Sequence, residues 1–176
     1  MVGYYKNEEA TKEAITPDGF LKTGDMGKFD AEGNLSITGR IKDIIITSGG
    51  KNISPQNIEN SLMFSAFINQ LAIIGDGRKY LSALIIPAFE VLEPWAKDNG
   101  ISFASRAELI KHEKVQALFE TQIKEYTKEY GQVEQIKKFT LLEKEWLQET
   151  GELTPTLKVK RRVITSKYSE MIDKMY

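Results

Sequence analysis

The stretch ITGRIKDIIITSGGKNISPQNIEN, residues 37–60, holds in succession a basic pair, an apolar run, two adjacent glycines and the start of a helix. Three consecutive β-branched isoleucines at 44–46 are typical of a strand. Residues 48–52, Ser-Gly-Gly-Lys-Asn, tolerate positive φ and predict a turn that returns the chain through Ile53. Ser54-Pro55 then provides a favourable N-cap and a proline at the first helical position. The stretch predicts a hairpin followed by a helix.

The patterns on either side of this stretch predict a mixture of short strands and helices. The first forty residues are expected to be β structure, with a hairpin around the glycine-containing loop 30–34. Apolar runs, helical spacing and turn residues predict further strands at 71–74, 81–86 and 139–142, and helices at 89–99, 113–130 and from 161 onward. Mixed elements without a regular βα alternation indicate an α+β fold.

Composition limits the classes of protein that this chain can be. Its 176 residues, 41% of them hydrophobic, are enough to bury roughly two thirds of the unfolded surface. The 24 basic and 25 acidic residues nearly cancel, which argues against a general nucleic-acid binder. The absence of cysteine and the single His112 leave neither a thiolate nor a histidine-cluster metal site. We expect a cytoplasmic protein with no transmembrane segment, no nucleic-acid partner and no metal site of its own.

The glycine pair does not fit the common phosphate-binding motifs. A Walker loop aligned on Gly50-Lys51 would require glycine in place of Ile45 and a hydroxyl in place of Asn52. The dinucleotide fingerprint also fails, because these glycines form a turn after a strand and do not open a helix. Taken by itself, the motif is best explained as an ordinary hairpin turn.

Four motifs in a fixed order change this interpretation. They are GFLKTGD at 19–25, GRIKD at 39–43, ISPQNIE at 53–59 and TPTLKVKR at 154–161. The series resembles the adenylate-forming superfamily of acyl-CoA synthetases, peptide synthetase adenylation domains and luciferases, and within it the long-chain fatty acid–CoA ligases. The resemblance covers nearly the whole chain, from GYYKN at 3–7 onward.

The resemblance implies that the chain is the C-terminal portion of such an enzyme. Residues 1–40 would be the terminal β segment of the large N-terminal adenylating domain, and residues 41–43 would be the hinge. Residues 44–176 would form the mobile C-terminal domain, a small α+β lid with a hairpin and a short β-sheet packed by helices.

The resemblance also implies roles for individual residues. Asp25 would bind the ribose hydroxyls of ATP, and Arg40 would make a second ribose or phosphate contact. Both residue types suit these roles, because a carboxylate can accept hydrogen bonds from two vicinal hydroxyls and a guanidinium offers a fork of hydrogen-bond donors. Asp43 would be the hinge residue. Gly49 and Gly50 would let the backbone approach the pantetheine of coenzyme A, although turn geometry alone also explains two glycines.

Lys158 is implied as the catalytic residue. The family motif T-x-S-G-K-x-x-R appears here as T-P-T-L-K-V-K-R, so that Leu157 replaces a glycine. A carboxylate that attacks the α-phosphate of ATP builds up negative charge, which a positioned lysine can stabilise. The competing interpretation takes Lys158, with Lys160, Arg161 and Arg162, as a basic patch for nucleic acid or a localisation signal. The balanced overall charge argues against that alternative.

The implied reaction activates a fatty acid with Mg-ATP to an acyl-adenylate and then transfers the acyl group to coenzyme A. Mg²⁺ would be held mainly by the N-terminal domain, which is the expected partner, so that the isolated chain should be inactive or nearly so. Three alternatives stay open: a short- or medium-chain synthetase, another adenylate-forming enzyme, and a non-catalytic binding module that acts in trans. Peripheral contact with a membrane also stays open.

Overall fold

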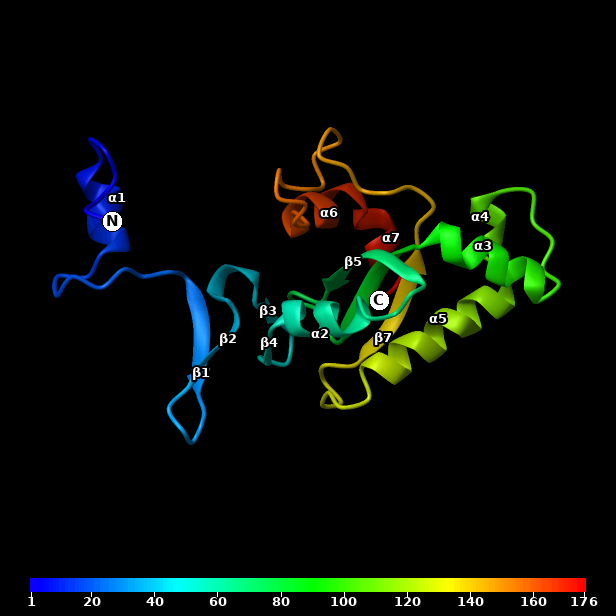
Figure 1. Cartoon of the computed structure of the whole chain (residues 1–176), viewed down its shortest axis with the longest axis horizontal. Helices are drawn as coiled ribbons and strands as arrows, with labels where there is room; N and C mark the ends of the chain where they lie inside the picture. The colour runs from blue at the N-terminus through cyan, green and yellow to red at the C-terminus, as the bar shows by residue number, and fades with distance from the viewer. The chain divides into compact units, whose positions relative to one another are not determined.

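The computed structural model describes residues 1–176, which form two compact units, 1–44 and 45–176. The first unit contains helix α1 (Glu8–Ala14), strands β1 (Asp25–Phe29) and β2 (Leu35–Arg40) and the short 3-10 helix η1 (Ile41–Asp43) (Figure 1). β1 and β2 pair antiparallel around the loop 30–34, which confirms the hairpin predicted there. No residue of this unit is buried, and Phe20, Phe29, Leu35 and Ile37 are exposed. The unit therefore has no hydrophobic core of its own.

Helix α1 corrects the expectation that the first forty residues are β structure. The Asn7 side chain caps this helix by accepting a hydrogen bond from the Ala10 amide at 3.0 Å. Glu8 and Glu9 lie in the first turn, where negative charge interacts favourably with the helix dipole. These local signals favour a helix over 8–14.

The second unit begins with a small hairpin and continues as a three-stranded sheet covered by helices. The hairpin consists of β3 (Ile45–Ile46) and β4 (Asn52–Ile53). The other elements are α2 (Pro55–Leu62), β5 (Ile68–Ile74), β6 (Leu81–Pro87), α3 (Phe89–Asp98), α4 (Arg106–Leu109), α5 (Glu113–Tyr126), β7 (Ile136–Leu141), α6 (Arg161–Lys167) and α7 (Ser169–Asp173). The predicted α+β fold of this part is confirmed. None of the helices is both long and apolar enough to cross a membrane.

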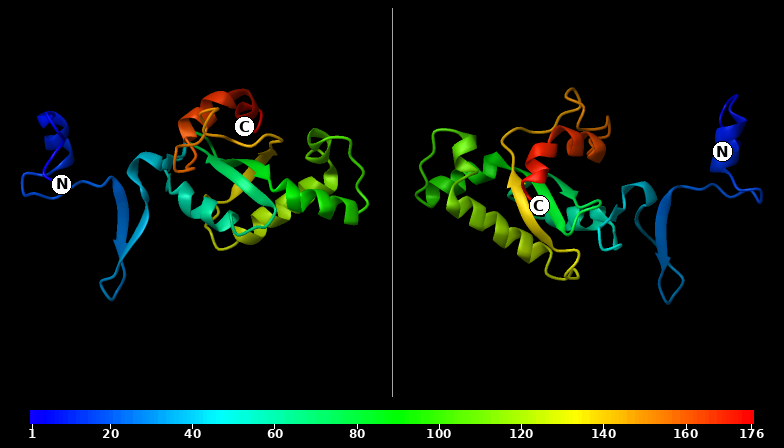
Figure 2. Two further views of the ribbon diagram at one scale, coloured as in Figure 1. Left: turned by 45° about the horizontal axis from the view of Figure 1, so that its top comes forward. Right: turned by 180° about the vertical axis from the view of Figure 1, so that it is seen from behind.

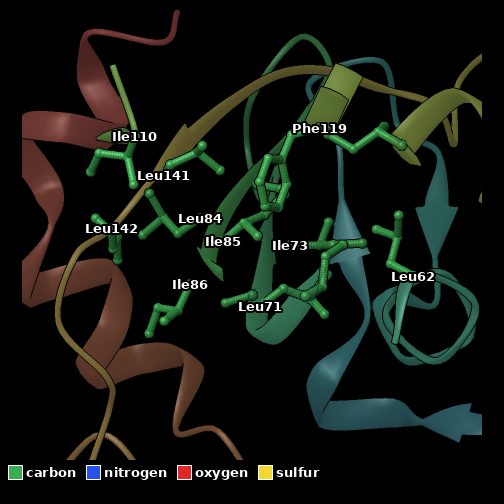
Figure 3. Close-up of a cluster of buried hydrophobic side chains, with 14 of the residues drawn as sticks. Leu62, Leu71, Ile73, Leu84, Ile85, Ile86, Ile110, Phe119, Leu141 and Leu142 are labelled. Atoms are coloured by element: carbon green, nitrogen blue, oxygen red, sulfur yellow. The ribbon is translucent and has the colours of Figure 1, made fainter. Parts of the chain in front are cut away.

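Strand β6 lies in the middle of the sheet and is buried along its whole length. It pairs antiparallel with β5 and parallel with β7. Helices α2 and α5 cover one face of the sheet, and α6 and α7 cover the other (Figure 1 and Figure 2). Because both faces are covered, the strand is apolar at almost every position and does not alternate. Figure 3 shows Phe119 of α5 and Leu62 of α2 beside Ile85 and Ile73 of the sheet.

The C-terminal segment differs from the single helix that its pattern predicts. It is divided into α6 and α7 at Tyr168, whose backbone leaves the helical region and whose ring packs near Trp146. Ile164 and Ile172 are nevertheless both buried, so the break preserves the apolar face that the periodicity indicated. The predicted helix 113–130 also ends earlier, at Tyr126, and α4 was not predicted.

A mostly buried ion pair connects the start of α6 to α2 and β5. Arg161 Nη2 lies 2.8 Å from Glu59 Oε1, and Arg161 Nη1 donates to the carbonyl of Ile73. Glu59 also accepts a hydrogen bond from the Ile73 amide at 2.9 Å. Loss of one partner of a buried pair typically costs about 3–5 kcal/mol, because the other charge stays buried without compensation. Arg161 therefore has a structural role and is not part of an exposed basic patch.

Candidate functional site

The first unit brings Asp25 and Arg40 together. These residues are opposite each other in the β1–β2 register, and Arg40 Nε donates to Asp25 Oδ1 at 2.8 Å. The hydrogen bond and charge of Asp25 raise the pKa of Arg40, with a smaller contribution from Asp43. Strand pairing thus places a carboxylate and a guanidinium side by side, although they are 15 residues apart in the chain.

Asp43 ends the 3-10 helix η1, one residue before the first unit ends at Ile44. Hinges are commonly a few loop or element-terminal residues, and Asp43 is the last residue of such an element. The predicted boundaries, with a hinge at 41–43, stay a prediction.

The glycine hairpin, residues 45–53, forms as the sequence predicts, with Ile45 opposite Ile53 and Ile46 opposite Asn52. A turn brings the Gly50 amide to the Thr47 carbonyl at 2.8 Å, and Gly50 has φ +74°. This backbone conformation favours glycine. Gly49 is different, since its φ is not positive and an added Cβ would meet only Thr47 Oγ1, at 3.9 Å. Turn geometry therefore accounts for Gly50 and leaves Gly49 unexplained.

The support loop, residues 75–80, holds the glycine hairpin from the side. The Ile46 amide donates to Asp76 Oδ1 at 3.0 Å, and the Gly77 amide donates to the Ile46 carbonyl at 2.8 Å. The Ser48 amide donates to the Arg78 carbonyl at 2.8 Å. The Asp-Gly pair at 76–77 is typical of a turn, but it does not indicate the partner of Asp76 30 residues away.

The lysine loop, residues 153–159, presents Lys158. Leu153 and Val159 pair as a β-bridge, and the Leu157 amide donates to the Thr154 carbonyl at 2.9 Å. Thr154 Oγ1 accepts from the Lys158 amide at 3.0 Å, which fixes the lysine backbone. The Lys158 side chain is exposed and forms no ion pair. Leu157 has φ +60°, so the residue in the family's glycine position keeps a glycine-like conformation.

Glu152 anchors the base of the lysine loop. Its side chain is buried and accepts hydrogen bonds from Lys167 Nζ and Thr150 Oγ1, while its carbonyl accepts from the Lys160 amide at 2.7 Å. Burial alone raises the pKa of Glu152, but the hydrogen bonds and the charge of Lys167 outweigh this effect and lower the pKa to about 2. No sequence signal indicated this residue, because its partner comes from α6.

The predicted site residues thus lie in three groups: Asp25 with Arg40 in the first unit, and the glycine hairpin and lysine loop in the second. A groove of about 960 Å³ elsewhere in the second unit contains none of them. It runs between α5, β7 and α7, and its basic residues are Lys124, Lys128, Lys137, Lys138 and Lys174. Lysines on an edge strand hinder its pairing with another strand. This role explains Lys137 and Lys138 of β7 without any bound ligand.

Residues 1–176 do not bring together three or more His, Cys, Asp or Glu side chains that could hold a metal ion.

The second unit is thus an α+β body with a glycine hairpin and a lysine loop, and the first unit carries a β-hairpin that pairs Asp25 with Arg40. The family model described as AMP-binding enzyme C-terminal domain matches residues 42–176, and the chain belongs to this family.

Comparisons with individual proteins agree with this assignment. The long-chain fatty acid–CoA ligase FadD15 of Mycobacterium tuberculosis is 40% identical over 175 residues, which cover 99% of this chain and 29% of the ligase. Among solved structures, the adenylation domain of a carboxylate reductase from Mycobacterium chelonae superposes with a TM-score of 0.81 at 24% identity, covering 99% of this chain and 26% of that one. The corresponding domain from Segniliparus rugosus, solved with AMP and a carboxylic acid, has a TM-score of 0.79 at 24% identity with the same coverage. These structural matches show the fold, and the chain spans under a third of each of these proteins.

The two glycines of the hairpin should respond differently to substitution. We expect Gly50→Ala to lower stability by about 1 kcal/mol, because alanine is strained at positive φ. Gly49→Ala, in open space with ordinary φ, should change stability by less than about 0.5 kcal/mol. Thermal denaturation of the two variants tests this difference, and equal losses would show that the turn itself requires both glycines.

The anchoring of the lysine loop should weaken in acid. Because the pKa of Glu152 falls on folding from its ordinary value of 4.5 to about 2, its contribution to stability is present above pH 4.5 and is lost as the pH falls toward 2. Glu152→Gln should therefore lower the melting temperature at pH 7, and its difference from the wild type should shrink by pH 3. A difference that stays constant between these pH values would contradict this account.

Proposed function

We propose that the chain is the C-terminal part of an AMP-forming long-chain fatty acid–CoA ligase. The observation that carries the proposal is the presence of Lys158 and the glycine hairpin in one compact unit, together with the relationship to fatty acid–CoA ligases. The complete enzyme would convert a fatty acid and ATP to acyl-adenylate and pyrophosphate, and would then transfer the acyl group to coenzyme A. The cytoplasmic location stays a prediction.

In the first half-reaction, the Lys158 ammonium would face the α-phosphate of ATP. A carboxylate oxygen attacks phosphorus while the bond to pyrophosphate breaks, so negative charge accumulates on oxygens that a lysine can stabilise. The Thr154 hydroxyl accepts a hydrogen bond from the Lys158 amide and so fixes the lysine backbone. The positive φ of Leu157 sets the direction of the chain just before Lys158. Asp25 would accept from the ribose hydroxyls, and Arg40 would orient Asp25 and contact ribose or phosphate.

In the second half-reaction, the body 45–176 would rotate about Asp43 and present the glycine hairpin. The space beside Gly49 supports this role, because the absence of a Cβ there would let pantetheine lie against the backbone. The thiolate of coenzyme A would then attack the acyl carbonyl and release AMP.

The exposed apolar side chains of the first unit support the expected partner. Phe20, Phe29, Leu35 and Ile37 are exposed in a unit that has no buried residue. An apolar surface of this kind usually lies at a contact with other protein. We propose that the N-terminal adenylating domain covers this surface and supplies the acyl pocket and the Mg²⁺ ligands.

The two half-reactions of the full-length enzyme test the role of Lys158. Lys158→Ala should reduce pyrophosphate release from fatty acid and ATP by about 10²–10³-fold, while acyl-CoA formation from supplied acyl-adenylate is largely retained. Lys160→Ala, which removes a neighbouring exposed cation, is the matched control and should leave both rates unchanged. If Lys158→Ala had no effect on either rate, Lys158 would be a surface cation and a binding module would be the better interpretation.

A further inference from the structure

The glycine hairpin is too small to hold its own position. It contains two residue pairs, Ile45 with Ile53 and Ile46 with Asn52. An isolated two-stranded hairpin is at best marginally stable in water. Its orientation therefore depends on contacts with the rest of the second unit. The support loop makes three hydrogen bonds to the hairpin backbone, through Asp76, Gly77 and Arg78.

The support loop is in turn held by residues 173–176, almost a hundred positions later in the chain. The Arg78 guanidinium pairs with Asp173, and its central carbon lies 4.8 Å from the centre of the Tyr176 ring. The rings of Tyr80 and Tyr176 are stacked, with centroids 4.9 Å apart. One arginine thus uses its backbone carbonyl to hold Ser48 of the glycine hairpin and its side chain to hold the C-terminal segment.

The Tyr176 hydroxyl adds polar contacts at the same point. It lies 3.1 Å from the Tyr80 carbonyl and 3.2 Å from the Ile74 carbonyl, so its single proton is shared between two acceptors at the two ends of the support loop. Ser82 Oγ, at 2.9 Å, can donate to the same hydroxyl. These contacts fix the two ends of the support loop relative to each other, and the loop holds the hairpin together with Ile45 and Ile53, which are buried in the core.

We propose that Arg78, Tyr80 and Tyr176 form a clamp that positions the glycine hairpin for thioester formation. These three side chains are positioning residues that act through the support loop, and no role in acyl-adenylate formation is assigned to them. The inference rests on the proposed function, since it gives the hairpin its task in the second half-reaction.

The experiment compares Arg78→Leu and Tyr176→Phe in the full-length enzyme with a matched control, Arg106→Leu. Arg106 makes the same two kinds of contact as Arg78, an ion pair with Glu93 at 2.9 Å and a ring contact with Phe89 at 4.3 Å, but it does not touch the support loop. The readouts are amide hydrogen exchange at Ser48 and Gly77, the KM for coenzyme A and the rates of the two half-reactions.

For Arg78→Leu we expect about tenfold faster exchange at Ser48 and Gly77, because the side-chain contacts that hold the support loop are lost. The KM for coenzyme A should rise, thioester formation should slow, and acyl-adenylate formation should stay within about twofold of the wild type. Tyr176→Phe keeps the ring stacking and should show the same pattern more weakly. Arg106→Leu should leave all four readouts unchanged.

Unchanged exchange at Ser48 and Gly77 in Arg78→Leu would overturn the clamp, as would an equal loss in both half-reactions. If the proposed function itself were wrong, the wild-type enzyme would form no acyl-CoA. The exchange rates would still show whether the clamp holds the hairpin.

Discussion

The burial of strand β6 on both faces is the constraint on which the second unit depends. A strand that is apolar at nearly every position needs a covering layer on each side, and the chain supplies α2 and α5 on one face and α6 and α7 on the other. The glycine hairpin leads directly into α2, and the lysine loop leads into α6. The two candidate functional segments are thereby attached to helices on opposite faces of one sheet.

This arrangement gives a physical reason for the proposed alternation between the two half-reactions. One compact unit cannot easily present segments from opposite faces to the same substrate at the same time. Rotation about a short connection between the two units, with Asp43 next to it, would allow each segment to act in turn. The ion pair of Arg161 with Glu59 fits such a movement, because it connects the start of α6 to α2 and β5 within the second unit.

The sequence predicted those features that depend on local patterns. The glycine hairpin, the helix after Ser54-Pro55 and strands β5 and β6 follow from β-branched runs, turn residues and a favourable helix start. It did not predict contacts between distant segments. The contacts of Asp76 with Ile46 and of Glu152 with Lys167 could not be predicted, because these partners become neighbours only in the folded chain. The break at Tyr168, whose ring lies near Trp146, is likewise not indicated by helical periodicity.

We propose that the body 45–176 takes two orientations relative to the first unit during the reaction. The most direct measurement is the distance between spin labels at Glu32→Cys and Glu129→Cys in the full-length enzyme, with any cysteine outside this cysteine-free segment replaced. Both residues are exposed and lie away from the candidate sites. We expect one distance distribution with ATP and a fatty acid analogue bound, and a clearly different one after an acyl-adenylate analogue and coenzyme A are added. A single distribution unchanged between these states would contradict it.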